Sequence, residues 1–491
     1  MTSVTTRQGE VRGFTTGTGI QVFLGIPYAA PPVGPDRFRP PRPAEPWTGP
    51  RDATRYGPTA PQKSTEDGPL GELGSPPVIP GDDYLNLNVW TPDPAGRAPV
   101  MVFVHGGSFT SGSGALSTYD GTRFARDGVV LVTINYRLGA DGFLWFGEGA
   151  PNLGLLDQVA ALTWVRDNIG GFGGDPGQVT VFGESAGAMS VCSLLAMPAA
   201  NGLFHRAIAQ SGAGHSTISP ATARLVGTRL AAVLGVEPTR EAIAGVPMEK
   251  LLAAQSQIAE EVVASQSPRR WGEVARNLMP FEPVVDGEVL PAAPVDRLQA
   301  GVNPQVDLLI GTNSEEARLF LVPTGAAAKI KNLVVHAAAL RYRLPPLRGV
   351  RTYRAHRPEA TPGDLLAAIM TDWYYWIPAL RLAEARPGTH VYECAWRSPA
   401  FGHRLGACHA IELPFVFDRL DDPAVRALLG DHPPQPLADA MHRAWVGFAT
   451  TGDPGWPAYA ADHRVVMRFD TDSATTVDDR AAERVLWDGR R

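Results

Sequence analysis

The segment Gly183-Glu184-Ser185-Ala186-Gly187 contains the residue of this sequence that is best suited to covalent chemistry. An apolar stretch, Val179 to Phe182, precedes the segment, and helix-compatible residues, Ala188 to Leu195, come after it. A serine at a sharp turn between a strand and a helix exposes its hydroxyl above the sheet edge, and the helix N-terminus offers N–H groups to an oxyanion. The pattern predicts that Ser185 is a nucleophile. The structural alternative is a helix N-cap at a glycine-rich turn.

A serine hydroxyl attacks efficiently only when a histidine takes its proton and a carboxylate holds that histidine in one tautomer. In the chain order that accompanies this type of turn, the acid and then the histidine follow the serine. The histidines beyond the acid candidates are His336, His356, His390, His403, His409, His432, His442 and His463. Only His403 and His409 fall in the loop after the strand that ends near Trp396. We prefer His409 because small residues precede it and the apolar stretch Leu413 to Phe417 anchors the chain after it, although a loop histidine bonded to backbone is the alternative.

Two adjacent carboxylates, Glu315 and Glu316, follow the predicted strand Val306 to Ile310. Ligand sites of α/β sheets lie at the carboxyl ends of strands, so one of these two residues is expected to be the catalytic acid. A pair of carboxylates that stabilises the start of a helix is the alternative.

An oxyanion site also needs backbone N–H groups from a second loop. The apolar strand Val102 to Val104 breaks into His105-Gly106-Gly107-Ser108, which is typical of such a loop. We expect Gly107, Ser108 and Ala186 to donate these N–H groups. Taken alone, the loop could equally be a glycine-rich turn with no further role.

The elements that must position these residues alternate between short apolar runs and helical segments, which is typical of an α/β fold. A helix is predicted over Leu153 to Ile169, with one apolar face made of Leu155, Leu156, Val159, Leu162 and Ile169. Buried strands are predicted at Leu87–Thr91, Val100–Val104, Val129–Asn135, Val179–Phe182, Arg206–Gln210, Val306–Ile310 and His390–Trp396. We expect one domain over residues 1–491 with a large, mostly parallel mixed sheet. Helical insertions at about 219–258 and 312–386 would form pocket walls.

The composition favours a small molecule as partner rather than nucleic acid or a membrane. The formal net charge is −6, with 44% hydrophobic and 19% charged residues, and no long run of like charges occurs. Three cysteines without metal-like spacing indicate neither a disulfide framework nor a zinc site. The first residues lack the apolar core of a signal peptide. These features lead us to expect a cytoplasmic protein.

The sequence resembles the type-B carboxylesterase/lipase family over almost its whole length. The matching segments are Phe23–Ala29, Pro31–Gly34, Arg37–Phe38, Asp83, Leu87–Val89, Asn135–Gly139, Gly154–Gln158, Phe172–Pro176, Gly183–Gly187, Gln210–Gly212, Gly452–Pro454 and Trp456–Pro457. The resemblance implies an α/β-hydrolase fold and a Ser-His-Glu triad of Ser185, His409 and Glu316, with His409 in a Gly-x-x-His-x-x-Glu segment that ends at Glu412. It also implies that Glu184 and Ser211 support the site from behind and that no metal or organic cofactor is needed.

Three positions depart from the family pattern. Tyr84 replaces a cysteine whose partner region reads Ala60-Pro61-Gln62, so the usual first disulfide is absent. Ala317 replaces the glycine after the acid. Ser108 replaces the third glycine of the oxyanion loop, and we expect its side chain to narrow the space near the scissile bond and to favour less crowded esters.

The resemblance implies hydrolysis of a small carboxylic ester through an acyl-enzyme. The same triad could act on carbamates, amides or thioesters, and some members of the fold are non-catalytic binding or adhesion proteins. Several apolar residues could line the substrate pocket or could instead pack in the core: Phe143, Trp145, Phe146, Leu319, Phe320 and Trp376.

Overall fold

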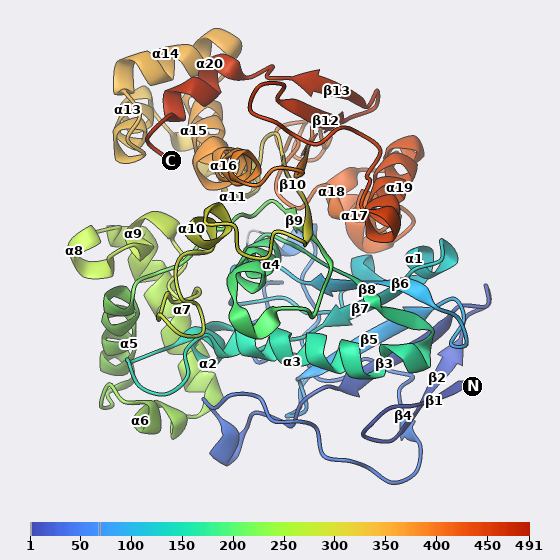
Figure 1. Ribbon diagram of the computed structural model, residues 1–491. Helices are drawn as coiled ribbons and strands as arrows, with labels where there is room; N and C mark the ends of the chain where they lie inside the picture. Colours follow the sequence, from blue (N-terminus) through green and yellow to red (C-terminus); the bar gives the residue numbers. More distant parts are fainter. Residues whose placement is uncertain (1, 67, 69) are drawn as a thin grey trace. The chain divides into compact units, whose positions relative to one another are not determined.

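The computed structural model describes residues 2–66, 68 and 70–491. The chain divides into two compact units (Figure 1). The first unit consists of Met1–Ser64, Pro76–Ala207 and Gly214–Val306, and the second of Thr65–Ser75, Ile208–Ala213 and Asp307–Arg491. Strand β9 (Arg206–Gln210) begins in the first unit and ends in the second.

The strands of the first unit form a mixed sheet in the order β1-β2-β3-β5-β7-β6-β8, with β4 beside β2. At its centre, β6 pairs in parallel with both β7 and β8, and Val102 stands opposite Val132 and Val181. Burial on both faces explains why these strands are continuous apolar runs rather than alternating ones. The bounds are β1 (Thr2–Thr5), β2 (Glu10–Thr15), β3 (Gln21–Pro27), β4 (Arg51–Asp52), β5 (Asn86–Thr91), β6 (Ala98–Val104), β7 (Val130–Ile134) and β8 (Gly174–Glu184).

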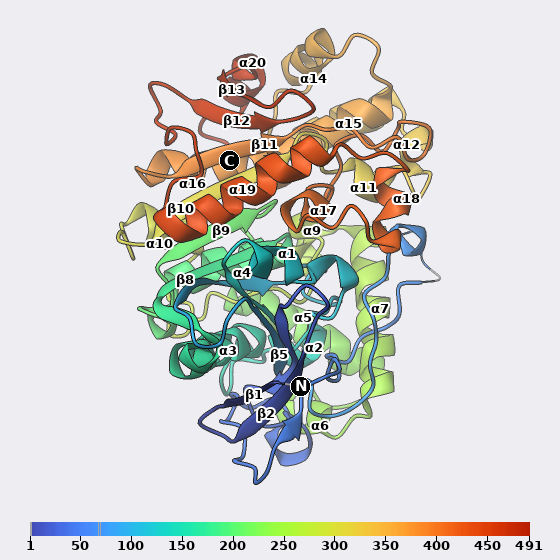
Figure 2. The same cartoon turned by 90° about the vertical axis from the view of Figure 1, so that its right-hand side faces the viewer.

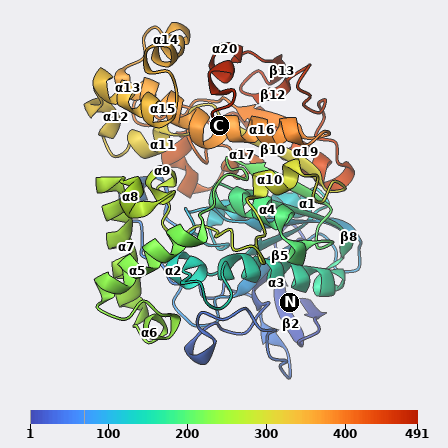
Figure 3. The same cartoon turned by 60° about the vertical axis from the view of Figure 1, so that its left-hand side comes forward.

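Helices of the first unit pack on this sheet and on one another. Helices α3 and α4 contact β8, α1 contacts β5 and β7, and α5, α7, α8 and α9 lie together as a group (Figures 1 and 3). The bounds are α1 (Thr122–Arg126), α2 (Gly139–Phe143), α3 (Leu153–Asn168), α4 (Ala186–Ala196), α5 (Pro220–Leu234), α6 (Arg240–Ala244), α7 (Met248–Ser265), α8 (Pro268–Trp271), α9 (Val274–Asn277) and α10 (Pro294–Gln299), with 3-10 turns at Gly34–Asp36, Ser117–Tyr119, Ile169–Phe172 and Pro198–Ala200.

The predicted helix at Leu153 is confirmed as α3, but its predicted buried face was wrong in part. Leu156 and Val159 are half-buried rather than part of the core. Two polar side chains are fully buried in their place. Asp157 binds the Arg137 guanidinium, and the Gln158 amide donates to Ser190 Oγ at 3.1 Å. The requirement for these polar contacts turns the helix away from the orientation that its apolar residues alone predict.

The second unit is built on strands β10 to β13, which follow one another in the sheet. Strand β11 pairs in parallel with β10 and β12, and β13 is antiparallel to β12. Helices α16 and α19 lie on opposite sides of these strands (Figures 1 and 2). The strand bounds are β10 (Asp307–Asn313), β11 (His390–Cys394), β12 (Val465–Phe469) and β13 (Ala474–Val477). Because β10 continues to Asn313, the second predicted insertion begins later than residue 312.

The helices of the second unit include a group formed by α12 to α15, which contact one another (Figure 3). The bounds are α11 (Arg318–Leu321), α12 (Ala326–Lys329), α13 (Asn332–Arg341), α14 (Pro346–His356), α15 (Pro362–Thr371), α16 (Ile377–Ala385), α17 (Leu413–Val416), α18 (Arg426–Leu429), α19 (Gln435–Thr451) and α20 (Ala481–Arg484), with a π-helical turn at Asp372–Trp376 and 3-10 turns at Gly71–Leu73, Pro423–Val425 and Val485–Trp487. Both predicted insertions are therefore helical, and their role as pocket walls stays a prediction.

The cysteines and the helices bear on two expectations from composition, namely the absence of a disulfide framework and of a membrane partner. Cys192, Cys394 and Cys408 are buried free thiols. Within the described ranges, no helix combines the length and the apolar character that crossing a membrane requires.

A fully buried ion pair joins α3 to the loop after β7. The Arg137 guanidinium donates to Asp157 Oδ2 at 2.7 Å and to Oδ1 at 2.6 Å, and neither side chain is exposed. Arg137 also donates its backbone N–H to Asp157 at 3.0 Å and a guanidinium N–H to Arg39 O at 2.7 Å. Burial is the largest single influence and lowers the pKa of Arg137, but the Asp157 charge, the hydrogen bonds to Asp157 and the Asp141 charge together outweigh it and raise this pKa above its usual value.

Replacing Asp157 by asparagine is expected to destabilise the first unit. The change leaves the Arg137 charge buried without a matching anion, which costs about 3–5 kcal/mol of unfolding free energy. Urea unfolding followed by tryptophan fluorescence measures the effect. Asp127→Asn is the control, because Asp127 and its partner Arg126 are about a third to a half exposed and such surface pairs contribute up to about 1 kcal/mol. Equal effects of the two changes would contradict the buried-pair argument.

Candidate active site

Ser185 occupies the single residue between β8 and α4. Its backbone has φ 57° and ψ −122°, a combination that residues with side chains rarely adopt. The flanking glycines permit the turn, because a Cβ on Gly187 would lie 2.0 Å from Val104 O and a Cβ on Gly183 would lie 2.7 Å from the same oxygen. Strand β6 thus passes so close that only glycine fits on either side of Ser185. The strand, turn and helix that the sequence predicts are confirmed.

The loop after β6 presents backbone N–H groups close to the serine turn. Gly107, Ser108 and Phe109 all have positive φ, at 109°, 53° and 60°. In the part of the chain that the structure describes, the N–H groups of Gly107 and Ser108 donate no hydrogen bond to the protein. Ala186 is the first residue of α4, where backbone N–H groups lack intrahelical acceptors. These three groups are thus available to a ligand oxygen.

A buried histidine and a buried tyrosine brace this loop. His105 Nδ1–H donates to Gly106 O at 2.8 Å, and its ring stacks on Tyr136 with centroids 4.5 Å apart. Tyr136 Oη–H donates to His105 O at 2.8 Å. Burial lowers the pKa of His105 to about 4, so this ring stays neutral near pH 7. Burial, and after it the Glu184 charge, raises the pKa of Tyr136.

The positions where relatives are expected to carry cysteines are used for hydrogen bonds here. The Gln62 amide accepts from Gly112 N–H at 2.8 Å and donates to Gly112 O at 2.8 Å, which holds the end of the loop after β6. Tyr84 Oη–H donates to the buried Asp141 at 2.8 Å. Sequence reasoning missed both contacts, because neither side chain lies near its partner in the sequence.

Glu316 and His409 form a buried pair in the second unit. His409 Nδ1 lies 2.6 Å from Glu316 Oε2, and His409 N–H donates to Glu316 O at 3.2 Å. Glu316 Oε1 accepts from the backbone N–H of Asn313, the last residue of β10, at 2.7 Å. A carboxylate at Nδ1 keeps the proton on that nitrogen and leaves Nε2 as the basic one. The pair can therefore accept a proton at Nε2.

A second buried carboxyl, Glu412, lies in the same network. Its oxygens accept from the Asn313 side-chain amide at 2.7 Å and from the Gln210 amide at 3.1 Å. Burial, and after it the Glu316 charge, raises the pKa of Glu412. Ser211 Oγ accepts from the Asn313 amide at 3.3 Å, so Ser211 belongs to this network, whereas Glu184 lies buried in the first unit beside Gly106. Sequence reasoning missed Asn313 and Gln210, although each is the last residue of a strand.

The residues predicted as a possible pocket lie in different surroundings. Phe143 is buried against Phe109, with ring centroids 4.9 Å apart, and Trp145 and Phe146 border a very small cavity of the first unit. Phe320 is 37% exposed and its ring centroid lies 5.3 Å from that of His409. Tyr375, which precedes Trp376, was not predicted. Its ring centroid lies 5.0 Å from that of His409.

Leu319 is half-buried, and Trp376 is buried beneath the Arg480 guanidinium, 5.6 Å from its ring centroid. Phe320 and Tyr375 therefore frame the histidine ring in the second unit. The assignment of a substrate pocket to the six predicted residues stays a prediction.

Comparisons with known proteins find relatives over almost the whole chain. The Carboxylesterase family model matches residues 1–486. The chain is 39% identical over 506 residues to para-nitrobenzyl esterase of Bacillus subtilis (strain 168), covering 98% of this chain and 97% of that protein, and 36% identical over 484 residues to phenmedipham hydrolase of Pseudarthrobacter oxydans, covering 94% of each. A solved carboxylesterase of Geobacillus stearothermophilus is similar with a TM-score of 0.86 and 37% identity, covering 99% of this chain and 100% of that chain.

These comparisons establish the class of protein. The chain has the α/β-hydrolase fold and is a carboxylic-ester hydrolase. It belongs to the carboxylesterase family, as the resemblance in the sequence predicted.

Gly106→Ala is expected to disturb the loop after β6, which the sequence predicts to bind the oxyanion. The added Cβ would lie 2.8 Å from Glu184 O and 3.1 Å from Ser185 Cβ, so the loop must move away from the serine. Losing one oxyanion donor costs roughly 10²- to 10³-fold in kcat, and we expect a loss of this order. The kcat for a short para-nitrophenyl ester measures it, with Gly170→Ala as control, because a Cβ there meets nothing within 4 Å. A kcat within twofold of wild type would contradict the close contact.

Proposed function

We propose that the chain hydrolyses carboxylic esters through an acyl-enzyme on Ser185, with His409 as general base and acid and Glu316 as the residue that orients His409. The strained backbone of Ser185 at the start of α4 carries this proposal. That conformation is costly, by about 1–3 kcal/mol, and under this proposal it directs the hydroxyl toward the N–H groups of Gly107, Ser108 and Ala186. The Glu316–His409 pair supports the same chemistry from the second unit.

The proposed reaction proceeds in two acyl transfers. His409 Nε2 takes the proton of Ser185 Oγ as that oxygen attacks the ester carbonyl, and the resulting oxyanion accepts hydrogen bonds from Gly107, Ser108 and Ala186. His409 then returns the proton to the departing alcohol. Water, activated by the same nitrogen, releases the carboxylic acid and restores Ser185. Glu316 keeps its hydrogen bond to Nδ1 and stabilises the imidazolium that forms in each step.

Aryl and benzyl esters of short acids are the proposed substrates. The para-nitrobenzyl esterase relative supports this choice, and so does Ser108, whose side chain stands where the family has glycine and leaves less room beside the scissile bond. Phenmedipham is a second candidate because the other relative is named for its hydrolysis. The alternative is that the same three residues hydrolyse carbamates, amides or thioesters.

Ser185→Ala is expected to abolish most of the activity. Loss of the nucleophile in a serine enzyme lowers kcat by roughly 10⁶-fold, and a loss of at least several orders of magnitude is expected here. Initial rates with para-nitrophenyl acetate, a para-nitrobenzyl ester and phenmedipham, each measured for wild type and variant, test it. Near-wild-type turnover of any of these substrates by the variant would place that hydrolysis elsewhere in the molecule.

Glu316→Gln tests the orienting role. The amide is nearly isosteric but can present its NH₂ to His409 Nδ1, which favours the wrong tautomer. In a serine protease the comparable change lowers kcat about 10⁴-fold, and a loss of that order with little change in KM is expected. The variant and wild type are compared with the same ester at pH values from about 6 to about 9, which span the ordinary pKa of histidine. A kcat reduced less than tenfold would rule out Glu316 as the orienting acid.

A further inference from the structure

Glu315, the neighbour of the proposed catalytic acid, holds the backbone just before His409. Glu315 N–H donates to Ala407 O at 2.9 Å, and Ala407 N–H donates to Glu315 Oε2 at 3.0 Å. Both polar backbone groups of Ala407 are thus bound by one residue. The start of a helix, the structural alternative for Glu315, does not apply because α11 begins only at Arg318.

The chain packs tightly at this contact. Gly406 has φ 65°, and a Cβ there would lie 2.2 Å from Glu315 Oε2. The carboxylate therefore occupies the space that a side chain at position 406 would need. This explains why position 406 is glycine.

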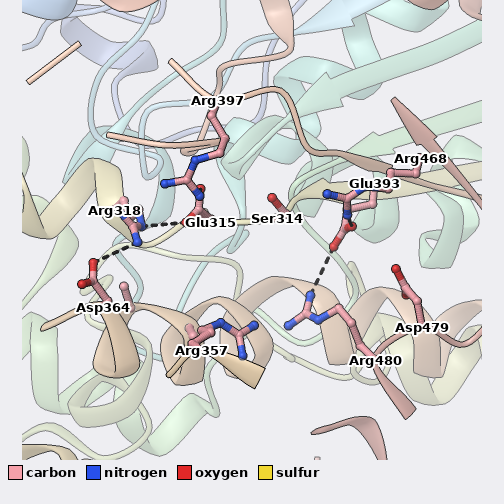
Figure 4. A pocket seen from close by; sticks show the side chains of 12 residues that line it. Ser314, Glu315, Arg318, Arg357, Asp364, Glu393, Arg397, Arg468, Asp479 and Arg480 are labelled. Carbon is pink, nitrogen blue, oxygen red and sulfur yellow. Dashed lines mark hydrogen bonds and ion pairs between the residues drawn. The ribbon is translucent and has the colours of Figure 1, made fainter. Parts of the chain in front are cut away.

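Two arginines fix the direction of the Glu315 carboxylate. Arg318 Nε lies 2.9 Å from Oε1, and Arg397 Nη1 lies 2.5 Å from Oε2, and Figure 4 shows both side chains directed at Glu315. Arg318 also donates to Arg404 O at 2.7 Å and pairs with Asp364 at 2.9 Å. The loop is therefore held at Arg404 and at Ala407 by one ionic cluster.

This cluster lines a cavity of about 220 Å³ in the second unit. The arginines around the cavity are already matched by carboxylates, so the cavity offers no surplus positive charge to an anionic ligand. The pairs are Arg318 with Glu315 and Asp364, Arg357 with Glu483, Arg397 with Glu315, Arg468 with Glu393, and Arg480 with Asp372, Glu393 and Glu483. We therefore attribute Arg318 and Arg397 to holding Glu315 and the loop before His409, rather than to binding a ligand.

We propose that Glu315 is a positioning residue for His409. Glu316 holds the imidazole at Nδ1 and the backbone N–H of His409, while Glu315 holds the chain two residues earlier. The adjacent glutamates thereby fix both the ring and the loop that carries it. This role rests on the proposed function, in which Nε2 of that ring takes the serine proton.

The test compares Glu315→Ala and Glu315→Gln with wild type. Titration with a fluorophosphonate, carried to completion, counts reactive serines, and kcat is then expressed per titrated serine. Because a misplacement of about 1 Å costs on the order of 10²-fold, Glu315→Ala is expected to lower kcat per site roughly 10- to 100-fold while KM changes less than about threefold. The kcat per site of Glu315→Gln is expected to lie between those of Glu315→Ala and wild type. Its amide oxygen can still accept from Ala407 N–H but carries no charge to form ion pairs with the arginines.

Asp478→Asn is the matched control. Asp478 also faces two arginines, Arg484 at 2.8 Å and Arg464 at 3.8 Å, and is similarly exposed, but both partners lie outside the histidine loop. Its kcat per site should equal that of wild type. Hydrogen exchange of a peptide spanning residues 404–412 should accelerate in Glu315→Ala and not in Asp478→Asn.

Three results would overturn the role of Glu315. In the first, Glu315→Ala shows fewer titrated serines with an unchanged kcat per site, which is the signature of lost folding alone. In the second, exchange in residues 404–412 is the same as in wild type. In the third, wild-type hydrolysis does not depend on Ser185, in which case the proposed function fails as well, so the Ser185→Ala rate separates that failure from the first two.

Discussion

Between β8 and α4 the chain changes direction within one residue, and the geometry of the first unit depends on that constraint. Ser185 can adopt φ 57° and ψ −122° only because Gly183 and Gly187 allow β6 to pass against the turn. The same closeness brings the loop after β6 beside the serine. His105, Tyr136 and Gln62 then hold that loop by hydrogen bonds to its backbone. A strained serine is thus surrounded by groups that cannot easily relax away from it.

The second unit holds three carboxyl groups close to one histidine, two of them buried and one half-buried. Glu316 receives a backbone N–H and the imidazole N–H, and Glu412 receives two side-chain amides. Glu315 is balanced by two guanidinium groups. Each of these carboxyl groups therefore has its own hydrogen-bond donors, which offset part of the cost of burying it.

Local sequence patterns predicted the parts of the fold that are local in origin. The apolar runs indicated the strands that flank the site, and the glycines around Ser185 indicated the turn. The error at Leu156 on the predicted face of α3 arose from Asp157, whose partner Arg137 lies in the loop after β7. The choice between Glu315 and Glu316 likewise came from the family resemblance, because spacing treats the two alike. Only the structure shows that one faces the imidazole and the other the arginines.

Strands β12 and β13 were missed for a similar reason. They are short and only partly buried, β13 is not an apolar run, and the pairing of β12 depends on β11. Asn313, Gln210 and Tyr375 contact the histidine network through side chains whose partners lie on other elements, far away in the sequence. No period or motif in one sequence encodes such pairings.

The proposed mechanism requires that the oxygen of Ser185 forms the covalent intermediate. The most direct measurement is peptide mass mapping of the wild-type protein after reaction with a fluorophosphonate at an equimolar amount. A single adduct is predicted on the peptide containing Ser185, formed in step with the loss of esterase activity. Loss of activity with the adduct on another residue, or full modification of Ser185 with activity retained, would contradict it.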